Sequence, residues 1–167
     1  MRKRAGNRAV LFFGLAILLA ACSPAISKQV LREANRSIRF QELQKDPDRY
    51  AGQVVVEGGQ ILSATPREGD TWVEVLQQPL DWRNKPQDTD VSHGRFLVRL
   101  PGFQDPTLYA VGQKITVAGQ VQGKRVQPIG MTQYTYPVLI SKEFHLWKAG
   151  SGGPSFHIGI GVEGVIR

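Results

Sequence analysis

The segment from Lys114 to Val121 alternates between two kinds of side chain, and this pattern constrains the fold more than any other. Its odd-numbered residues are apolar or glycine, and its even-numbered residues are polar apart from Ala118. A period of two residues is that of a half-buried β-strand. The chain must therefore build a sheet of which one face is covered.

Other segments rich in β-branched and aromatic residues are bounded by turn residues and are also predicted as strands. They are Gln53–Ala64, Thr71–Gln77, Gly94–Leu100 and Tyr134–Trp147. A long polar loop is predicted over 78–93, a turn at Gly123-Lys124, and a short further strand over Val126–Met131.

A glycine pair, Gly58-Gly59, inside the first predicted strand indicates a bulge or a sharp bend that curls the sheet. One short helical segment is expected within Ser37–Tyr50, ended by Asp46-Pro47. These features predict a mainly all-β domain over residues 37–148, a small five- to six-stranded antiparallel barrel like the OB-fold. A plain antiparallel sandwich is the alternative architecture.

The N-terminus has the parts of a secretory signal peptide over residues 1–21. Basic residues precede an apolar segment, Ala9–Ala21, whose 13 residues are fewer than the roughly 18 needed to span a bilayer. The segment ends in Leu19-Ala20-Ala21-Cys22, the pattern of a bacterial lipobox. It predicts lipid on the Cys22 thiol and cleavage between Ala21 and Cys22. An uncleaved membrane anchor and an ordinary buried thiol are the alternatives.

Cleavage changes what the composition implies. It removes four of the 21 basic residues and none of the 14 acidic ones, so the formal net charge falls from +7 to +3. The remaining charge gives little support to a nucleic-acid partner, and none is predicted. Cys22 is the only cysteine, so no internal disulfide forms. Residues 22–36 are predicted to be a lipidated tether, and 149–167 a glycine-rich tail.

Several motifs follow the lipobox in order along the chain. They are Phe40-x-x-Leu43-x-x-x-Pro47-x-x-Tyr50-x-Gly52-Gln53, Gly58-Gly59-x-Ile61, Glu74-Val75-Leu76-x-x-Pro79-Leu80-Asp81, Gly94-Arg95-Phe96-Leu97, Gly102-Phe103-x-Asp105-Pro106 and Gly119-x-Val121-x-Gly123. Together with the lipobox, they resemble the motifs of the Slp family of starvation-inducible outer-membrane lipoproteins. The resemblance covers about Ala20 to Trp147. The short tail departs from it, because it lacks the aromatic- and proline-rich extension of some members.

The resemblance implies a protein without established catalytic residues, anchored in the outer membrane and facing the periplasm. Its role would be linked to envelope stress or the stationary phase, or be structural. The expected partners are outer-membrane lipid, through acylated Cys22, and the machinery of lipoprotein maturation and transport. Ser23 is similar to the residue that permits sorting to the outer membrane.

The sequence offers little for catalysis. The three histidines, His93, His145 and His157, lack the short spacings of common metal sites, so neither a metal nor a cofactor is predicted. There is no Gly-x-Ser-x-Gly elbow. The chain is therefore predicted not to be an enzyme, with a periplasmic hydrolase as a remote alternative.

One possible binding face is predicted on the barrel, for an oligosaccharide or an envelope protein. Aromatic and basic side chains hold such ligands on OB-folds. The predicted face consists of Trp72, Arg95, Arg99, Tyr134 and Tyr136, with Trp147, Lys124 and Arg125 beside it. The alternative is that these aromatic residues only pack on the core or the strand surface.

Overall fold

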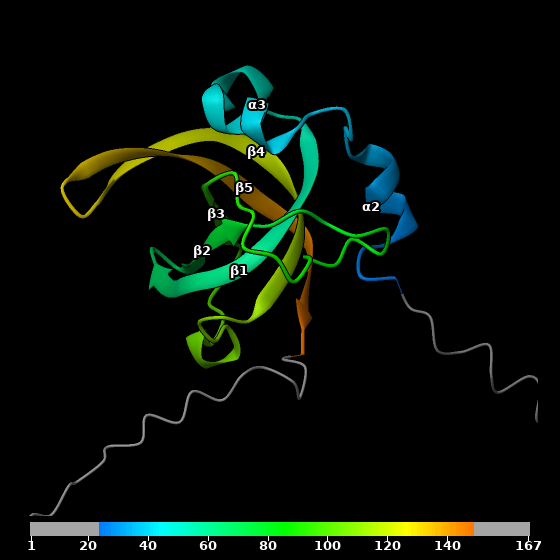
Figure 1. The fold of residues 1–167 in the computed structure, drawn as a ribbon. Coiled ribbons are helices and arrows are strands. Elements are labelled where there is room, and N and C mark those ends of the chain that lie inside the picture. Colours follow the sequence, from blue (N-terminus) through cyan, green and yellow to red (C-terminus); the bar gives the residue numbers. More distant parts are fainter. Residues whose placement is uncertain (1–23, 149–167) are drawn as a thin grey trace, which may run out of the picture.

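Five strands close into a barrel in the order β1-β2-β3-β5-β4 (Figure 1). The computed structural model describes residues 24–148. The strands are β1 (Val54–Arg67), β2 (Asp70–Gln77), β3 (Arg95–Leu100), β4 (Lys114–Ile129) and β5 (Thr132–Trp147). The predicted OB-fold-like barrel is thereby confirmed. One pairing departs from the antiparallel prediction, because β3 runs parallel to β5.

A bend in β1 lets this strand pair with two different neighbours. Residues 54–60 pair with β4, and residues 59–67 pair with β2. At the bend, a Cβ on Gly59 would lie 1.9 Å from the carbonyl oxygen of Leu76. Only glycine fits there, as the glycine pair indicates. The register shift itself comes slightly later, between Ile61 and Ser63.

The predicted turn at Gly123-Lys124 is wrong. β4 continues through it to Ile129, and the chain turns at Gly130 and Met131 before β5. Gly123 has a φ of 103° and lies at a register irregularity between β4 and β5, so it forms a bulge. A glycine at positive φ suits a turn and a bulge equally, which is why the sequence pattern was ambiguous. The predicted strand at Val126–Met131 is the end of β4.

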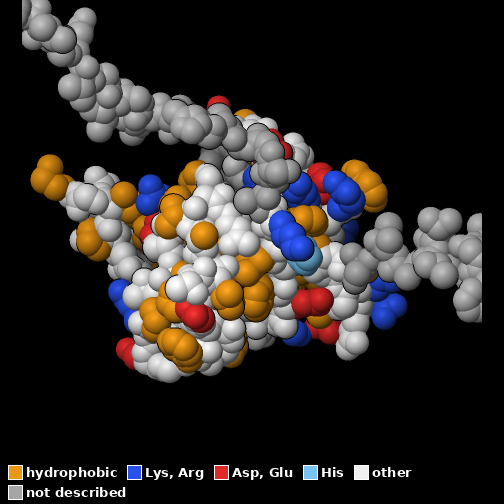
Figure 2. Space-filling view, turned by 90° about the horizontal axis from the view of Figure 1, so that it is seen from below, with side chains coloured by type: hydrophobic (Ala, Val, Ile, Leu, Met, Phe, Trp, Pro, Cys, Tyr) orange, Lys and Arg blue, Asp and Glu red, His pale blue; other side chains and the backbone are white. Residues whose placement is uncertain are grey.

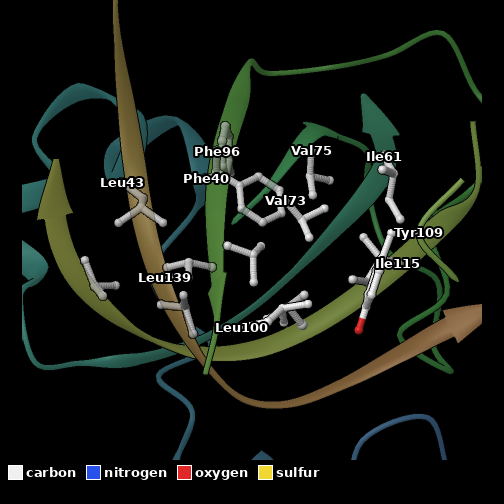
Figure 3. Close-up of a cluster of buried hydrophobic side chains, with 14 residues drawn as sticks. Phe40, Leu43, Ile61, Val73, Val75, Phe96, Leu100, Tyr109, Ile115 and Leu139 are labelled. Carbon is white, nitrogen blue, oxygen red and sulfur yellow. The ribbon is translucent and has the colours of Figure 1, made fainter. Parts of the chain in front are cut away.

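The core fills the inside of the barrel (Figure 3). Every strand contributes to one cluster of buried side chains, among them Val55, Val73, Phe96, Val117 and Leu139. The alternation predicted for Lys114 to Val121 is present, because Ile115, Val117 and Val121 all belong to this cluster. The strand is not half-buried there, because Thr116 and Ala118 on its other face are also fully buried.

The helical segment that precedes β1 covers one end of the barrel (Figure 1). It begins with α3 (Phe40–Lys45), which ends before Asp46-Pro47 as predicted, and continues with a 3-10 turn that was not predicted, η2 (Pro47–Tyr50). Phe40 and Leu43 are buried in the core, and the Phe40 ring lies 5.7 Å from that of Phe96 between centroids. Both of these large side chains come from α3, and Tyr50 of η2 packs against the same core. The short segment can therefore cover the end of the barrel.

The connection between β3 and β4 lies at the opposite end of the barrel (Figure 1). It contains the 3-10 turn η3 (Pro106–Leu108) and the buried Tyr109. Phe103, Leu108 and Val111 stay exposed. Figure 2 views the molecule from this side and shows apolar side chains interspersed with charged ones.

The predicted tether differs from the structure over residues 26–36, which pack on the barrel. Ile26 is completely buried, and α2 (Lys28–Glu33) follows it. The backbone N–H of Ser27 donates to both carboxylate oxygens of Glu143 at 3.0 Å, and Asn35 N–H donates to the Val54 carbonyl at 2.8 Å. The segment is polar and lacks a long apolar period, so its single buried isoleucine gave no clear pattern.

The loop over 78–93 is also fastened to the barrel. A bridge pairs Leu80 with Pro86, and the Thr116 hydroxyl donates to the Asn84 carbonyl at 2.5 Å. The Lys114 ammonium donates to the Pro86 carbonyl at 3.0 Å. The loop therefore covers the outer side of β1 and β4. None of the helices within residues 24–148 has the length and apolar character of a membrane span.

One carboxyl group faces the inside of the barrel. Glu57 lies opposite the core residue Val117 in the β1–β4 register and is 7% exposed. Burial raises the pKa of Glu57 to about 8, and a side-chain hydrogen bond with Gln77 offsets part of this effect. Since desolvation disfavours the charged form, Glu57 is largely protonated at neutral pH.

The docking of Ile26 is tested by Ile26→Ala. Truncating a buried isoleucine should lower the free energy of unfolding by about 2–5 kcal/mol. Gln29→Ala, an exposed change on α2, is the control and should have little effect. Urea unfolding followed by tryptophan fluorescence measures both. Equal, small effects would show that the segment behaves as a free tether.

The burial of Glu57 predicts a dependence of stability on pH. Between its ordinary value of 4.5 and the folded-state pKa of about 8, only the unfolded chain releases this proton. Stability from this group is therefore fully present below the lower pKa and is lost as pH rises through the higher one. Glu57→Gln should remove the loss, so that the variant exceeds wild type at pH 9 by at least about 1 kcal/mol and matches it near pH 5. Thermal unfolding at both pH values checks this, and parallel curves would contradict it.

Candidate binding face

The predicted face lies on the outer side of the barrel, over β2, β3 and β5. Because Val73, Val75, Phe96 and Val98 point inward, the residues between them point outward. Trp72 lies opposite Arg99 in the register, and Leu97 lies opposite both Glu74 and Val138. Alternation along these strands therefore brings the predicted residues onto one wall.

The aromatic residues of this wall form a second apolar cluster outside the barrel. Leu97, Tyr136 and Val138 are buried there, and Trp72 and Tyr134 pack against them. The rings of Tyr134 and Tyr136 meet edge to face, 4.7 Å apart between centroids. Trp72, Tyr134 and Tyr136 are thus brought together, but as members of a packed cluster.

Arg95 is bonded within the protein. Its Nη1 donates to Oε1 of Glu74 at 2.9 Å, and the Tyr136 hydroxyl donates to the same oxygen at 3.0 Å. The hydrogen bond with Glu74 raises the pKa of the Arg95 guanidinium. Burial and then the hydrogen bond to Glu74 raise the pKa of Tyr136. The backbone N–H of Arg95 donates to the Tyr134 hydroxyl at 2.8 Å.

Arg99 is occupied in the same way at the edge of the face. Its Nε donates to Oδ2 of Asp70 at 2.5 Å, and Oδ1 of Asp70 accepts from the Gly102 backbone N–H at 2.8 Å. The bond from Gly102, followed by that from Arg99, lowers the pKa of Asp70. Both predicted arginines therefore serve intramolecular ion pairs at their present positions.

Arg125 differs from these two arginines. Its guanidinium lies over the Trp72 ring, 4.5 Å from the centroid, and its Nη1 is buried without a hydrogen-bond partner in the protein. It lines a cleft of about 60 Å³ together with Ser63, Thr65, Arg67, Trp72, Glu74, Leu97 and Gln127. That volume accommodates a few water molecules or one small anionic group, and is too small for a sugar ring.

The remaining residues named beside the face lie elsewhere or have other partners. Trp147 donates from Nε1 to the Thr116 hydroxyl at 2.9 Å, under the 78–93 loop. Lys124 pairs with Asp48 at 2.7 Å. Sequence reasoning missed Arg67 and Gln127, although Ser63, Thr65 and Arg67 share a period of two that signals a common strand face.

The histidines show no metal centre in the described part of the chain. Across residues 24–148, no group of three His, Cys, Asp or Glu side chains is placed to hold a metal ion. The His145 ring instead lies 4.6 Å from that of Trp147. His157, and the lipobox residues Ala21 and Cys22 with Ser23, lie outside the described residues.

The closed ring of five strands defines the class, a small OB-like barrel domain. The sequence profile of the outer membrane lipoprotein Slp family matches residues 19–155. The chain therefore belongs to the Slp family, as the motifs indicated. The match includes the lipobox and the whole barrel.

Two relatives are similar over part of their length. The chain is 32% identical over 101 residues to the uncharacterized lipoprotein YeaY of Escherichia coli, covering 60% of this chain and 52% of the relative. It is 35% identical over 91 residues to an uncharacterized protein of Haemophilus influenzae, covering 54% and 49%. The matches thus span about half the length of these relatives.

Among solved structures, similar ones are single-stranded DNA-binding proteins. Rim1 from the mitochondria of S. cerevisiae is 17% identical with a TM-score of 0.37, covering 58% of this chain and 96% of that one. The small protein of Streptomyces coelicolor is 11% identical with a TM-score of 0.38, covering 57% and 94%. At these values, nothing about the ligand of this chain follows.

The bonding around Glu74 predicts that the face depends on this carboxylate. Glu74→Ala leaves a guanidinium and a phenol unpaired, so it should lower the free energy of unfolding by about 1–3 kcal/mol. Glu42→Ala is the control for an exposed carboxylate, because it removes the contacts of that group with the Arg39 guanidinium and backbone and should cost less than Glu74→Ala. Urea unfolding compares them. Equal effects would contradict a structural role for Glu74.

Proposed function

We propose that the chain is a non-enzymatic lipoprotein of the outer membrane, anchored through acylated Cys22 and facing the periplasm. The observation that carries the proposal is Leu19-Ala20-Ala21-Cys22, which ends a signal-like segment and lies within the family match. One acyl chain binds a membrane only marginally, whereas several chains give stable attachment. The thiol and the new amine of Cys22 together offer two sites for acylation.

A non-enzymatic role is supported by the state of the candidate face. Two ion pairs, Arg95 with Glu74 and Arg99 with Asp70, engage the charged side chains of this face within the fold. We therefore propose a structural role in the envelope, or one in stress or the stationary phase. The maturation and transport machinery of lipoproteins would be its transient partners, with Ser23 as the sorting signal.

A second function is favoured by the Arg125 cleft. Arg125 and Arg67 both line this cleft, and arginine pairs well with a carboxylate such as that at the end of a protein side chain. In this second function, the barrel would bind an envelope protein through the Arg125 cleft. Crosslinking from position 127 in intact cells, with capture of one envelope protein, would favour it.

Lipidation is tested by Cys22→Ala. The substitution removes the acylated thiol, so incorporation of labelled palmitate should fall to background. Ser23→Asp is the matched variant, because it keeps the cysteine; it should retain label but shift the protein to the inner-membrane fraction. Labelling and density fractionation measure the two effects. Unchanged labelling of Cys22→Ala would overturn the proposed anchor.

A further inference from the structure

The distance between the proposed anchor and the folded body is short, and this limits which surface meets the membrane. Ile26 is already completely buried on the barrel. Ile26 is four positions after Cys22 in the chain. An extended chain spans at most about 3.6 Å per position, so the two Cα atoms are at most about 14 Å apart. If Cys22 carries lipid as proposed, the wall around Ile26 is held at the membrane surface.

That wall can be identified from the strand register. The backbone N–H of Ser27 donates to the Glu143 carboxylate on β5. Glu143 lies opposite Ala118 of β4 in the register, and Ala118 lies opposite Val56 of β1. The N-terminal segment therefore lies over the outer side of β1, β4 and β5. Thr116 is two residues from Ala118, about 7 Å along the strand, and it holds the 78–93 loop through the Asn84 carbonyl. Figure 1 shows this loop reaching toward α2.

The tip of this loop presents an exposed indole. Trp82 is 88% exposed, the largest exposed aromatic side chain of the described residues. The turn is fixed by Asp81, whose Oδ1 accepts from the backbone N–H groups of Arg83 and Lys85, each at 2.8 Å. These bonds, led by that from Lys85, lower the pKa of Asp81. Trp82 is thus held outward by a built turn.

One cation lies beside the Trp82 indole, and others belong to the same loop or to α2. The Arg83 guanidinium lies 5.4 Å from the centroid of the Trp82 ring, and its Nε lies 3.7 Å from Oδ2 of Asp81 in a long ion pair that leaves the Arg83 side chain 57% exposed. The Lys85 ammonium lies 5.6 Å from the centroid of the Trp147 ring, next to the loop. Lys28 and Arg32 are exposed on α2. An amphipathic indole beside cations matches the headgroup layer of a phospholipid membrane.

We propose that Trp82 and Arg83 form a second contact with the membrane, beside the lipid anchor. The indole would enter the headgroup layer, and the guanidinium would bind lipid phosphate, for which arginine is well suited. The contact rests on the proposed acylation of Cys22, because the anchor supplies the proximity. Because the chain between Cys22 and Ile26 is so short, the partner that we propose for this wall is the lipid surface itself.

The test uses the full-length protein, purified from cells with palmitate label and reconstituted into phosphatidylethanolamine and phosphatidylglycerol vesicles. Brominated acyl chains in these vesicles quench any tryptophan at the membrane. Trp82→Phe should remove at least half of the quenching, whereas Trp72→Phe, which changes the tryptophan of the candidate binding face, should leave it nearly unchanged. Both variants keep an aromatic ring and should fold.

The outcomes separate this contact from the anchor. Labelled protein in vesicles whose quenching is the same in Trp82→Phe and wild type overturns the contact and leaves the anchor standing. Protein without label overturns both. Crosslinking of position 82 to a protein in cells, without quenching in vesicles, also overturns the lipid contact and identifies the loop as a protein-binding site.

Discussion

The barrel depends on the bend of β1 at Gly58 and Gly59. Without it, one strand could not pair with both β2 and β4, and the sheet would stay open at an edge. The space is set by the backbone itself, since the Leu76 carbonyl lies where a side chain of residue 59 would begin. Gly58 is also closely surrounded, because an added Cβ would lie 2.7 Å from the Ile115 carbonyl oxygen and 2.9 Å from Leu80 of the loop. Closure of the barrel and docking of the loop thus rely on the same two missing side chains.

Much of this arrangement was predictable from local chemistry. Period-two alternation located the strands, and the glycine pair located the bend. The sequence was weaker where one residue type serves two purposes, as Gly123 does, or where long-range contacts decide. Ile26 is such a case, because its burial depends on a wall formed by residues more than a hundred positions later. The parallel pairing of β3 with β5 also follows from closure of the barrel and not from any local signal.

The candidate face shows the same division. Composition and alternation named Trp72, Tyr134 and Tyr136, which the structure brings into one cluster. They could not show that Glu74 and Asp70 would occupy Arg95 and Arg99, since pairing depends on side-chain geometry across strands. Nor could they single out Arg125, which lies over the Trp72 ring and whose buried Nη1 has no hydrogen-bond partner in the protein. An arginine in a sequence signals a charge, while its availability is a property of the fold.

The parallel pairing of β3 with β5 is the shortest contact between neighbouring strands of the barrel. It extends over only three register positions, Leu97–Arg99 with Val138–Ile140, and joins segments distant in the chain. Hairpins connect β1 with β2 and β4 with β5, whereas no hairpin connects β3 with β5. The β3–β5 contact is therefore where we expect the strands to separate most easily. The external cluster joins Leu97 of β3 to Tyr136 and Val138 of β5, so it stabilises this short strand pairing from the outside. The aromatic residues that look like a ligand platform thereby keep the cylinder shut.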